Sequence, residues 1–260
     1  MNFFNRKHAV SETDPASLYG DSFYDRQVTD SLHTGRIYLK HLWRFLQPAS
    51  VLDVGCGRGT WLKACHELGS KKLCGFDGDW NTQSQMIDSA IDFRSVDLNK
   101  PFAIAEKFEL AMSLEVAEHL DLLAAPAFVK SLTEASDTVL FSAAYTMQGG
   151  TNHINEQPHT YWALLFAEHG SVPFDLFRPV FWGAEDISFW YRQNTFLYVR
   201  QNSAAYTKLV ESNGFKPLAD ISFMNCIHPQ LYNIKSAPRF KDQLSALLPS
   251  LRRAIQRRLF

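Results

Sequence analysis

The spacing of hydrophobic positions predicts alternating helices and strands along most of the chain. Apolar positions from Val28 to Leu46 recur at helical spacing, which predicts a helix over 26–47 that ends before Pro48. Further on, short unbroken apolar runs predict buried strands. The predicted strands are 51–54, 72–77, 92–96, 108–114 and 138–142, and the predicted helices among and after them are 60–68, 121–135 and 158–169.

The pattern changes after the fifth predicted strand, where a loop of roughly fifteen residues covers 143–157. A loop that long inside a compact domain is usually functional or disordered, and this one follows the carboxyl end of a strand, so we interpret it as an active-site loop. Beyond it, 172–178 and the aromatic-rich 189–199 are predicted as two last strands, and 203–213 as a short helix.

This alternation predicts an α/β fold, in which helices cover both faces of a parallel sheet and ligands bind beyond the carboxyl ends of the strands. Acidic residues occur where that rule puts a site. Asp77, Asp97 and Glu115 each lie at or near the end of a predicted strand. The sequence therefore predicts a ligand site at this edge of the sheet.

Composition and charge narrow the class of protein. The chain has 260 residues, enough for one large α/β domain with appendages, and a formal net charge of −1, which makes nucleic acid an unfavoured partner. Its four cysteines form no CxxC pair, which argues against a zinc site or a disulfide framework and fits a reducing compartment. Neither a signal peptide nor a membrane span is evident, so we expect a cytoplasmic protein.

The strand 51–54 runs into a glycine turn that indicates the type of ligand. Gly55, Gly57 and Gly59 alternate, which allows a tight turn and a close approach of the backbone to a ligand. A dinucleotide fingerprint would have a third glycine where Thr60 stands, so nicotinamide and flavin cofactors are disfavoured. Asp53 would repel a pyrophosphate but suits a cationic or hydroxyl-rich ligand.

The end of the next strand offers a contact for a ribose. Asp77, followed by Gly78, lies where a carboxylate can accept two hydrogen bonds from a ribose diol. Trp80 could stack on an adenine or simply cap the strand. Taken alone, each strand-end Asp could also be a helix N-cap or a turn residue.

The glycine turn, the strand-end acids and the segment 113–120 (Ser-Leu-Glu-Val-Ala-Glu-His-Leu) together resemble class I S-adenosylmethionine-dependent methyltransferases. The resemblance implies a Rossmann-like, seven-stranded, mostly parallel sheet of order 3-2-1-4-5-7-6, with S-adenosylmethionine as the cofactor. It also implies that Asp97 contacts the adenine amine, that Leu98 covers the ring, and that Leu114 and Glu115 line the cofactor. Arg36 could pair with the methionine carboxylate, as in related enzymes, or lie on a solvated helix face.

Two later segments resemble a bacterial subgroup of these enzymes that is often linked to surface-polysaccharide or secondary-metabolite genes. They are His-Ile-Asn-Glu at 153–156 and Trp-Tyr-Arg-Gln-Asn at 190–194, and the resemblance covers about residues 30–200. The chain lacks the Asn/Asp-Pro-Pro-Tyr type of motif associated with methylation of amino groups. The resemblance therefore favours O-methylation of a small molecule.

Methyl transfer needs an acceptor that is held in line and relieved of its proton, a task suited to histidine. His153 and His119 are the candidate bases, with Glu156 as the orienting partner, although these side chains could also only brace the loop. The spacing His153-x2-Glu156-x2-His159 would also permit a metal site. Pro158 interrupts the helix that would align such ligands, so we assign no metal site.

The carboxyl-terminal segment differs in charge from the rest of the chain. Residues 236–260 contain six Lys or Arg and one Asp, a local charge of +5, with leucines at helical spacing. Such a basic amphipathic helix can contact an anionic membrane or an acidic partner, or dock on its own domain. We predict a polar lead-in over 1–25, an S-adenosylmethionine-binding domain over 26–215 and a C-terminal extension over 216–260.

The sequence thus predicts a methyltransferase that acts on a hydroxyl of a small molecule such as a sugar or glycan precursor. The alternatives are a non-catalytic binding subunit of the same fold and a protein or RNA methyltransferase. The oligomeric state is not predicted.

Overall fold

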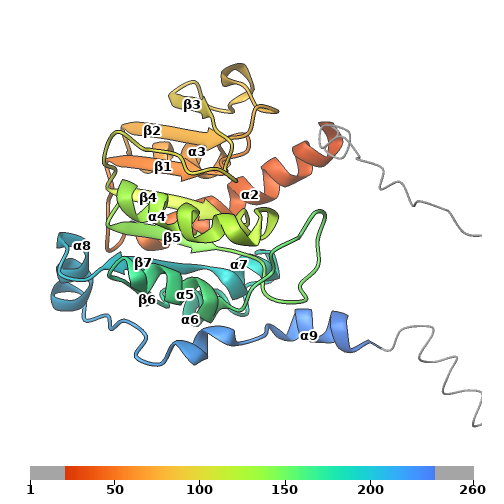
Figure 1. Ribbon diagram of the computed structural model, residues 1–260, viewed down its shortest axis with the longest axis vertical. Coiled ribbons are helices and arrows are strands. Elements are labelled where there is room, and N and C mark those ends of the chain that lie inside the picture. Colours follow the sequence, from red (N-terminus) through yellow and green to blue (C-terminus); the bar gives the residue numbers. More distant parts are fainter. Residues whose placement is uncertain (1–20, 238–260) are drawn as a thin grey trace, which may run out of the picture. The chain divides into compact units, whose positions relative to one another are not determined.

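A seven-stranded sheet forms the centre of the computed structural model, which describes residues 21–237 (Figure 1). Its order is β3-β2-β1-β4-β5-β7-β6, which confirms the predicted order. Strands β1 to β5 run parallel to one another, and β7 is antiparallel to both of its neighbours, β5 and β6. The strands are β1 Ser50–Val54, β2 Lys72–Asp77, β3 Ile91–Ser95, β4 Leu110–Leu114, β5 Thr138–Ser142, β6 Ser171–Phe174 and β7 Phe196–Arg200.

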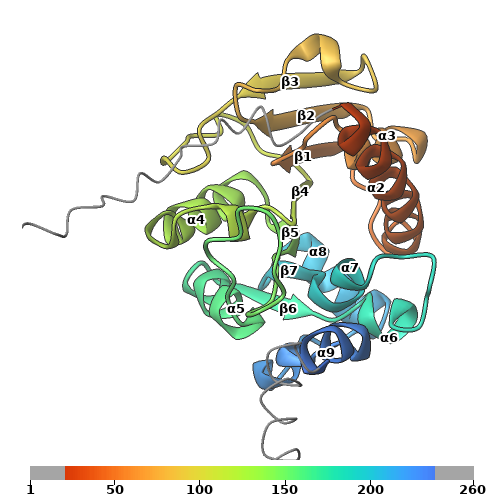
Figure 2. The same cartoon turned by 90° about the vertical axis from the view of Figure 1, so that its right-hand side faces the viewer.

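Helices cover both faces of this sheet, as predicted for the fold class (Figure 2). On one face α2 (Asp21–Leu42) and α3 (Thr60–Glu67) contribute Tyr38 and Trp61 to a hydrophobic core. On the other face α4 (Ala125–Ala135) and α5 (His159–Glu168) contribute Phe128 and Trp162 to a second core. The central strands are buried on both sides, which explains their unbroken apolar sequences.

Shorter helical segments connect these elements or follow them. They are the α-helices α6 Arg178–Phe181, α7 Phe189–Asn194 and α8 Ala204–Thr207, the 3-10 turns Gln83–Gln85, Ala117–His119, Leu122–Ala124 and Ile221–Asn225, and a π-helical turn at Lys208–Ser212. None of the helices between residues 21 and 237 combines the length and the apolar character needed to cross a membrane.

The predicted strand over 189–199 is wrong in its first half. Residues Phe189–Asn194 form α7, and only Phe196–Arg200 pairs in the sheet. The aromatic residues of this segment favoured a strand. The segment also contains three successive polar residues that are buried, Arg192, Gln193 and Asn194. An alternating strand would put some of them against an apolar face, whereas the helical turn lets each reach a polar partner.

Other boundaries shift by a few residues. Helix α2 ends at Leu42 rather than at 47 and is followed by a turn, and β6 ends at Phe174 because the chain turns into α6. Helix α4 begins at Ala125, after two 3-10 turns, with Pro126 in its first turn.

The chain separates into two units, one up to Asn225 and one from Cys226 onward. In the second unit the structure describes α9 (Pro229–Ser236), where the His228 side chain caps the first turn by accepting from the Gln230 amide at 3.2 Å. The predicted basic amphipathic helix and residues 1–20 of the predicted lead-in lie outside the described residues.

Candidate active site

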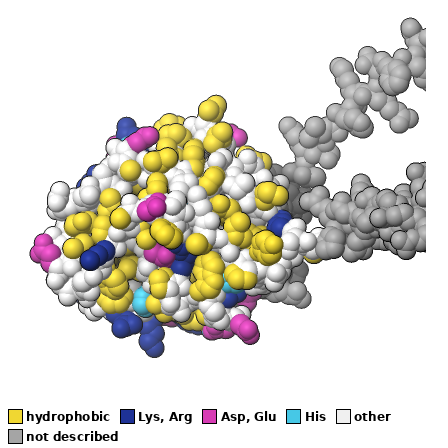
Figure 3. Space-filling model, turned by 90° about the horizontal axis from the view of Figure 1, so that it is seen from below, with side chains coloured by type: hydrophobic (Ala, Val, Ile, Leu, Met, Phe, Trp, Pro, Cys, Tyr) yellow, Lys and Arg dark blue, Asp and Glu magenta, His cyan; other side chains and the backbone are white. Residues whose placement is uncertain are grey.

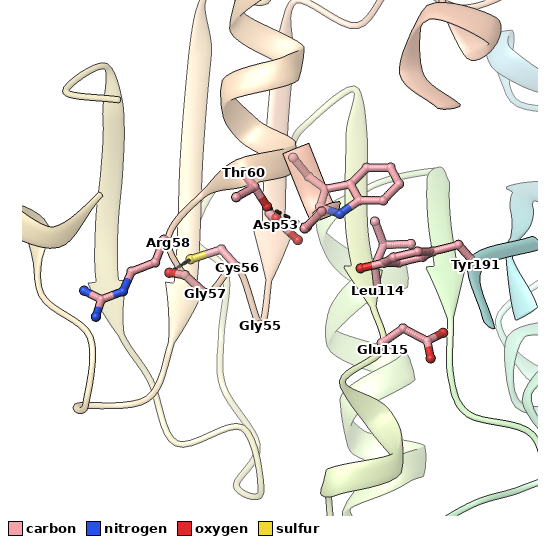
Figure 4. A pocket seen from close by; sticks show the side chains of 11 residues that line it. Asp53, Gly55, Cys56, Gly57, Arg58, Thr60, Leu114, Glu115 and Tyr191 are labelled. Atoms are coloured by element: carbon pink, nitrogen blue, oxygen red, sulfur yellow. Dashed lines mark hydrogen bonds between the residues drawn. The ribbon is translucent and has the colours of Figure 1, made fainter. Parts of the chain in front are cut away.

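A cavity of about 120 Å³ lies at the carboxyl ends of β1 and β4 (Figure 4). The strand order reverses between these two neighbours, and open α/β sheets bind ligands at such a point. Five residues predicted to bind the cofactor line it: Asp53, Gly55, Gly57, Leu114 and Glu115. A larger hollow of about 490 Å³ lies at the opposite edge, by the starts of β4 and β5, where this fold does not bind ligands.

The glycine turn needs glycine for two different reasons. Gly55 has φ 84°, and a Cβ there would lie 2.3 Å from Val116 Cγ2, so the turn packs directly against the segment after β4. Gly57 has φ 53°, and a Cβ there would meet nothing within 4 Å. Gly55 therefore lets the turn pack, whereas Gly57 presents open backbone toward the cavity.

Asp77 ties the end of β2 to this turn. Its Oδ2 accepts from the Gly57 amide at 2.6 Å and its Oδ1 from the Gly78 amide at 2.7 Å. Burial raises the pKa of Asp77, and these two hydrogen bonds together with one from the Asn81 side chain only partly offset the effect. A carboxylate can accept about four hydrogen bonds, so beyond the donors Gly57, Gly78 and Asn81 it can accept one more, such as a ribose hydroxyl.

Asp53 lies beside Asp77 and is more strongly perturbed. Burial, together with the neighbouring charge of Asp77, raises the pKa of Asp53 to about 8. Two buried carboxylates next to each other favour the binding of a positively charged ligand, which would restore the ionised form.

Glu115, the first residue after β4, has a left-handed backbone conformation with φ 57°. Its carboxylate accepts from Asn194 Nδ2 at 3.1 Å and from Gln148 Nε2 at 3.4 Å. Burial raises the pKa of Glu115, and these donors act in the opposite direction. The side chain is thereby fixed between α7 and the loop after β5.

The cavity is completed by residues that were not predicted to bind the cofactor, namely Ser31, Cys56, Arg58, Thr60, Trp61 and Tyr191. The hydroxyls of Ser31 and Thr60 lie 2.8 Å apart, and the rings of Trp61 and Tyr191 have centroids 5.5 Å apart. In Figure 4 the Tyr191 side chain extends from α7 toward the turn. Because residues 189–199 were predicted to form a strand, Tyr191 was not selected as a cavity residue. The three successive polar residues 192–194 are the feature of the sequence that argues against a strand here.

Two predicted cofactor residues face other parts of the protein. Gly59 is the N-cap of α3, and a Cβ there would lie 2.5 Å from Ile91 Cδ1, so this glycine packs against β3. The Arg36 guanidinium forms two hydrogen bonds of 2.7 Å to the Glu67 carboxylate on an exposed surface. Neither residue lines the cavity.

The predicted adenine contacts lie at the ends of β2 and β3, outside the cavity. Asp97 is exposed and forms an ion pair with Lys100 at 2.8 Å, which lowers its pKa, whereas Leu98 is buried. The Trp80 ring covers Gly78, where a Cβ would lie 2.2 Å from the indole. Trp80 is itself 55% exposed, so its outer face is open to a ligand.

The predicted catalytic residues form one cluster. His153 Nδ1 lies 2.8 Å from Glu156 Oε1, and the His153 ring meets that of His119 edge-on with centroids 4.8 Å apart. The amides of Ile154 and Asn155 each donate to the Glu118 carbonyl at 2.9 Å, so the loop after β5 is attached to the turn after β4. Burial, and then His153, lower the pKa of His119.

Glu118 is a further member of this cluster that the sequence analysis did not select. Its side chain is fully buried, which raises its pKa well above the usual range, and the charge of Glu115 acts in the same direction. His159, by contrast, lies elsewhere: its Nδ1 contacts the Met224 carbonyl at 2.7 Å and its Nε2 contacts Asn194 Oδ1 at 3.1 Å.

Comparison with known proteins identifies the family. A sequence model described as "Methyltransferase domain" matches residues 24–177. No curated protein matches the chain. Among solved structures, an O-methyltransferase family protein from Burkholderia thailandensis has a TM-score of 0.51 at 14% identity, over 71% of this chain and 60% of that chain. Streptomyces venezuelae DesVI has a TM-score of 0.50 at 13% identity, over 73% of this chain and 99% of that chain.

Human N-acetylserotonin methyltransferase, solved in complex with SAM, has a TM-score of 0.48 at 13% identity over 74% of this chain. This chain spans 60% of the length of that enzyme and 60% of the Burkholderia protein. At such identities the structural likeness shows the fold alone. The family model, however, matches more than half of the chain, so the protein belongs to the methyltransferase-domain family, whose members use S-adenosylmethionine as the cofactor.

Proposed function

We propose that this protein transfers the methyl group of S-adenosylmethionine to a hydroxyl of a small molecule. The observation that carries the proposal is the turn after β4: Glu115 lines the cofactor cavity, and three residues further on the Glu118 carbonyl accepts from the amides of Ile154 and Asn155 at 2.9 Å, directly after His153. A methyl donor in the cavity and an acceptor at the histidine cluster would therefore be neighbours, as in-line displacement requires.

The cofactor would extend from the cavity along the carboxyl ends of β1, β2 and β3. The enclosed space of about 120 Å³ is smaller than the ~300–1,000 Å³ of typical ligand pockets, so it suits the methionine part alone. The ribose diol would then bind Asp77, and the adenine would lie near Gly78, Leu98 and the exposed face of Trp80. In this arrangement Arg36, which is paired with Glu67, does not contact the methionine carboxylate.

The acceptor would bind at the cluster of His119, His153 and Glu156. Glu156 Oε1 also accepts from the Gly149 amide at 2.5 Å, so the carboxylate that orients His153 is itself fixed by the loop. With Nδ1 held by Glu156, His153 presents Nε2 to the acceptor, the arrangement of a histidine that removes a proton.

A small acceptor, such as a sugar or glycan precursor, agrees with the charge pattern better than a nucleic acid. The formal net charge is −1, and on the face seen in Figure 3 basic side chains are interspersed with acidic and hydrophobic ones. The basic segment 236–260 could add a contact to a membrane or an acidic partner. A protein acceptor would be a different class of substrate, and the peptides in the following assay test for it.

The test is a turnover assay with S-adenosylmethionine against pooled sugars, phenols and peptides, read by mass spectrometry. We expect a methylated hydroxyl compound and one S-adenosylhomocysteine for each methyl group transferred. His153→Ala should reduce turnover more than it reduces S-adenosylhomocysteine affinity. Methylation of a peptide alone would overturn the small-molecule proposal, and cofactor binding without any product would favour a non-catalytic binding subunit.

A further inference from the structure

Three side chains beside the cofactor cavity converge although they come from two segments. Glu118, His119 and His153 each offer one ligand atom, and these atoms lie within 4.8 Å of one another. The first two belong to the 3-10 turn after β4, and His153 belongs to the loop after β5. Two imidazoles and one carboxylate form a typical donor set for divalent transition metals, with further positions left open.

The Glu118 carboxylate gives independent evidence for a missing partner. Its side chain is 0% exposed, and although the amides of Glu118 and Ala144 approach the carboxylate, neither of its oxygens has a hydrogen-bond partner in good geometry within residues 21–237. A buried carboxylate without a partner is costly, and native proteins rarely keep one unless another group satisfies it. A cation bound by this carboxylate would remove that cost.

In both histidines the Nδ1 atom contacts an oxygen of the protein, as one ring nitrogen does in most metal-binding histidines. His153 Nδ1 contacts Glu156 at 2.8 Å, and His119 Nδ1 contacts the Asn152 carbonyl at 3.3 Å. Such contacts fix the ring orientation and leave Nε2 for an ion. A Cβ on Gly150 would lie 2.2 Å from His153 Nε2, so the His153 ring packs directly against the backbone of this glycine, which helps to fix the ring in place.

We propose that Glu118, His119 and His153 bind one divalent transition-metal ion next to the cofactor cavity. Ligands of such an ion lie about 2.0–2.2 Å from it, so three ligand atoms within 4.8 Å need only a small closure of their side chains. The spacing in the sequence would instead permit His153, Glu156 and His159 as ligands. In the structure Glu156 orients His153, and His159 points elsewhere.

The catalytic consequence rests on the proposed function. The ion would bind the acceptor oxygen and lower the pKa of its hydroxyl, so that the O–H bond breaks and the proton passes to solvent water. The oxygen then bonds to the methyl carbon while the carbon–sulfur bond of the sulfonium breaks, which releases neutral S-adenosylhomocysteine. His153 would act as an ion ligand in place of the proton acceptor.

The first experiment measures Co²⁺ binding to the full chain after treatment with EDTA, without cofactor or acceptor, by the visible absorption of the ion. We expect one equivalent bound, with affinity at least about 10-fold weaker in Glu118→Gln and His153→Ala. His66→Ala is the matched control, because His66 also forms a histidine–carboxylate pair, with Asp88 at 2.8 Å, but on an exposed surface. It should bind Co²⁺ as the wild type does.

A second pair of variants keeps all three proposed ligands, so the test does not depend on the ligand variants folding correctly. The Cβ of Gly150→Ala would displace the His153 ring, and Glu156→Ala removes the orienting partner of His153, so each should weaken Co²⁺ binding about 10–100-fold. Mn²⁺ should raise the melting temperature of the wild type and not that of Gly150→Ala. No Co²⁺ bound at millimolar concentration, or equal binding by wild type, Glu118→Gln and Gly150→Ala, would overturn the proposal.

Calorimetry with S-adenosylhomocysteine on the same samples separates this inference from the proposed function. Binding of S-adenosylhomocysteine without Co²⁺ binding overturns the ion site and leaves His153 as the proton acceptor. Binding of Co²⁺ without S-adenosylhomocysteine binding supports the ion site and overturns the methyltransferase function.

Discussion

Two buried carboxylates, Asp53 and Asp77, determine the electrostatics at the edge where β1 and β2 end. Burial raises the pKa of both, and Asp77 raises that of Asp53 further. Asp77 also accepts from the amides of Gly57 and Gly78, so it joins the glycine turn to the end of the next strand. One residue thus positions the turn and, in the proposed arrangement, also accepts from the ribose.

We expect Asp77→Ala to weaken S-adenosylhomocysteine binding by about 10–100-fold, because a charged acceptor is lost both for the ligand and for the turn. Isothermal titration calorimetry measures the change. Asp92→Ala is the control, because Asp92 is an exposed carboxylate on β3 that pairs with Arg94 at 2.7 Å. The Asp92→Ala variant should bind S-adenosylhomocysteine with the affinity of the wild type. Equal affinity in both variants would show that Asp77 makes no ribose contact.

Asp53 should make the unliganded protein less stable as the pH rises. Its pKa is about 8 in the folded protein against an ordinary value of 3.8, so the folded state holds the proton more tightly. The resulting stabilisation is complete below pH 3.8, declines above it, and is lost once the pH passes about 8. Melting temperatures between pH 5 and 9 should fall less in Asp53→Asn than in the wild type, and parallel curves would contradict the assignment.

Among the secondary-structure elements, the glycine turn between β1 and α3 contains one glycine that packs against another segment and one that faces open space. Gly55 touches Val116, which follows β4, whereas Gly57 has space in front of it. The turn therefore depends on β4 for its shape and leaves open backbone at Gly57, which lines the cavity.

The two glycines should respond differently to alanine. Gly55→Ala combines a left-handed backbone with a clash against Val116 and should cost about 2–5 kcal/mol of unfolding free energy. Gly57→Ala has only the backbone penalty, about 1–2 kcal/mol, yet should weaken S-adenosylhomocysteine binding. Urea denaturation and calorimetry measure the two effects. A larger loss of stability in Gly57→Ala would contradict this division of roles.

Asn194 at the end of α7 connects several elements. Its amide donates to Glu115 after β4 and to Gln148 Oε1 at 3.0 Å, while its oxygen contacts His159 of α5 at 3.1 Å. Asn194→Ala should cost about 1–3 kcal/mol of unfolding free energy, because buried polar groups lose partners. Asn213→Ala, which removes an exposed bond to the Lys208 carbonyl, should change stability by less than about 0.5 kcal/mol. Similar losses in urea denaturation would argue against the buried network.

The sequence allowed the sheet and the cofactor edge to be predicted because both depend on local patterns. Unbroken apolar runs mark buried strands, and the glycines and acids at their ends follow from the topology. Neither Tyr191 nor Glu118 was predicted as a site residue, because the position of each depends on contacts between segments that are distant in the sequence. Aromatic residues around Tyr191 favoured a strand, and only the tertiary partners of Arg192 and Asn194 make the helix preferable.

At the scale of the whole molecule, the parallel strands bring the cofactor edge and the histidine cluster together. The turn after β4 contributes to both, since Glu115 lines the cavity and Glu118 holds the loop that carries His153. Helix α7 and α2 contribute Tyr191 and Ser31 to the cavity. The proposed donor and acceptor sites are thereby parts of one sheet edge.

The central claim is that this edge binds S-adenosylmethionine, and calorimetric titration of the purified full chain with S-adenosylhomocysteine tests it most directly. We expect one binding site with a dissociation constant in the micromolar range, roughly 1 μM to 1 mM, as is usual for enzyme ligands, and weaker binding in Asp77→Ala. Absence of binding to the folded wild type at millimolar ligand would contradict the account.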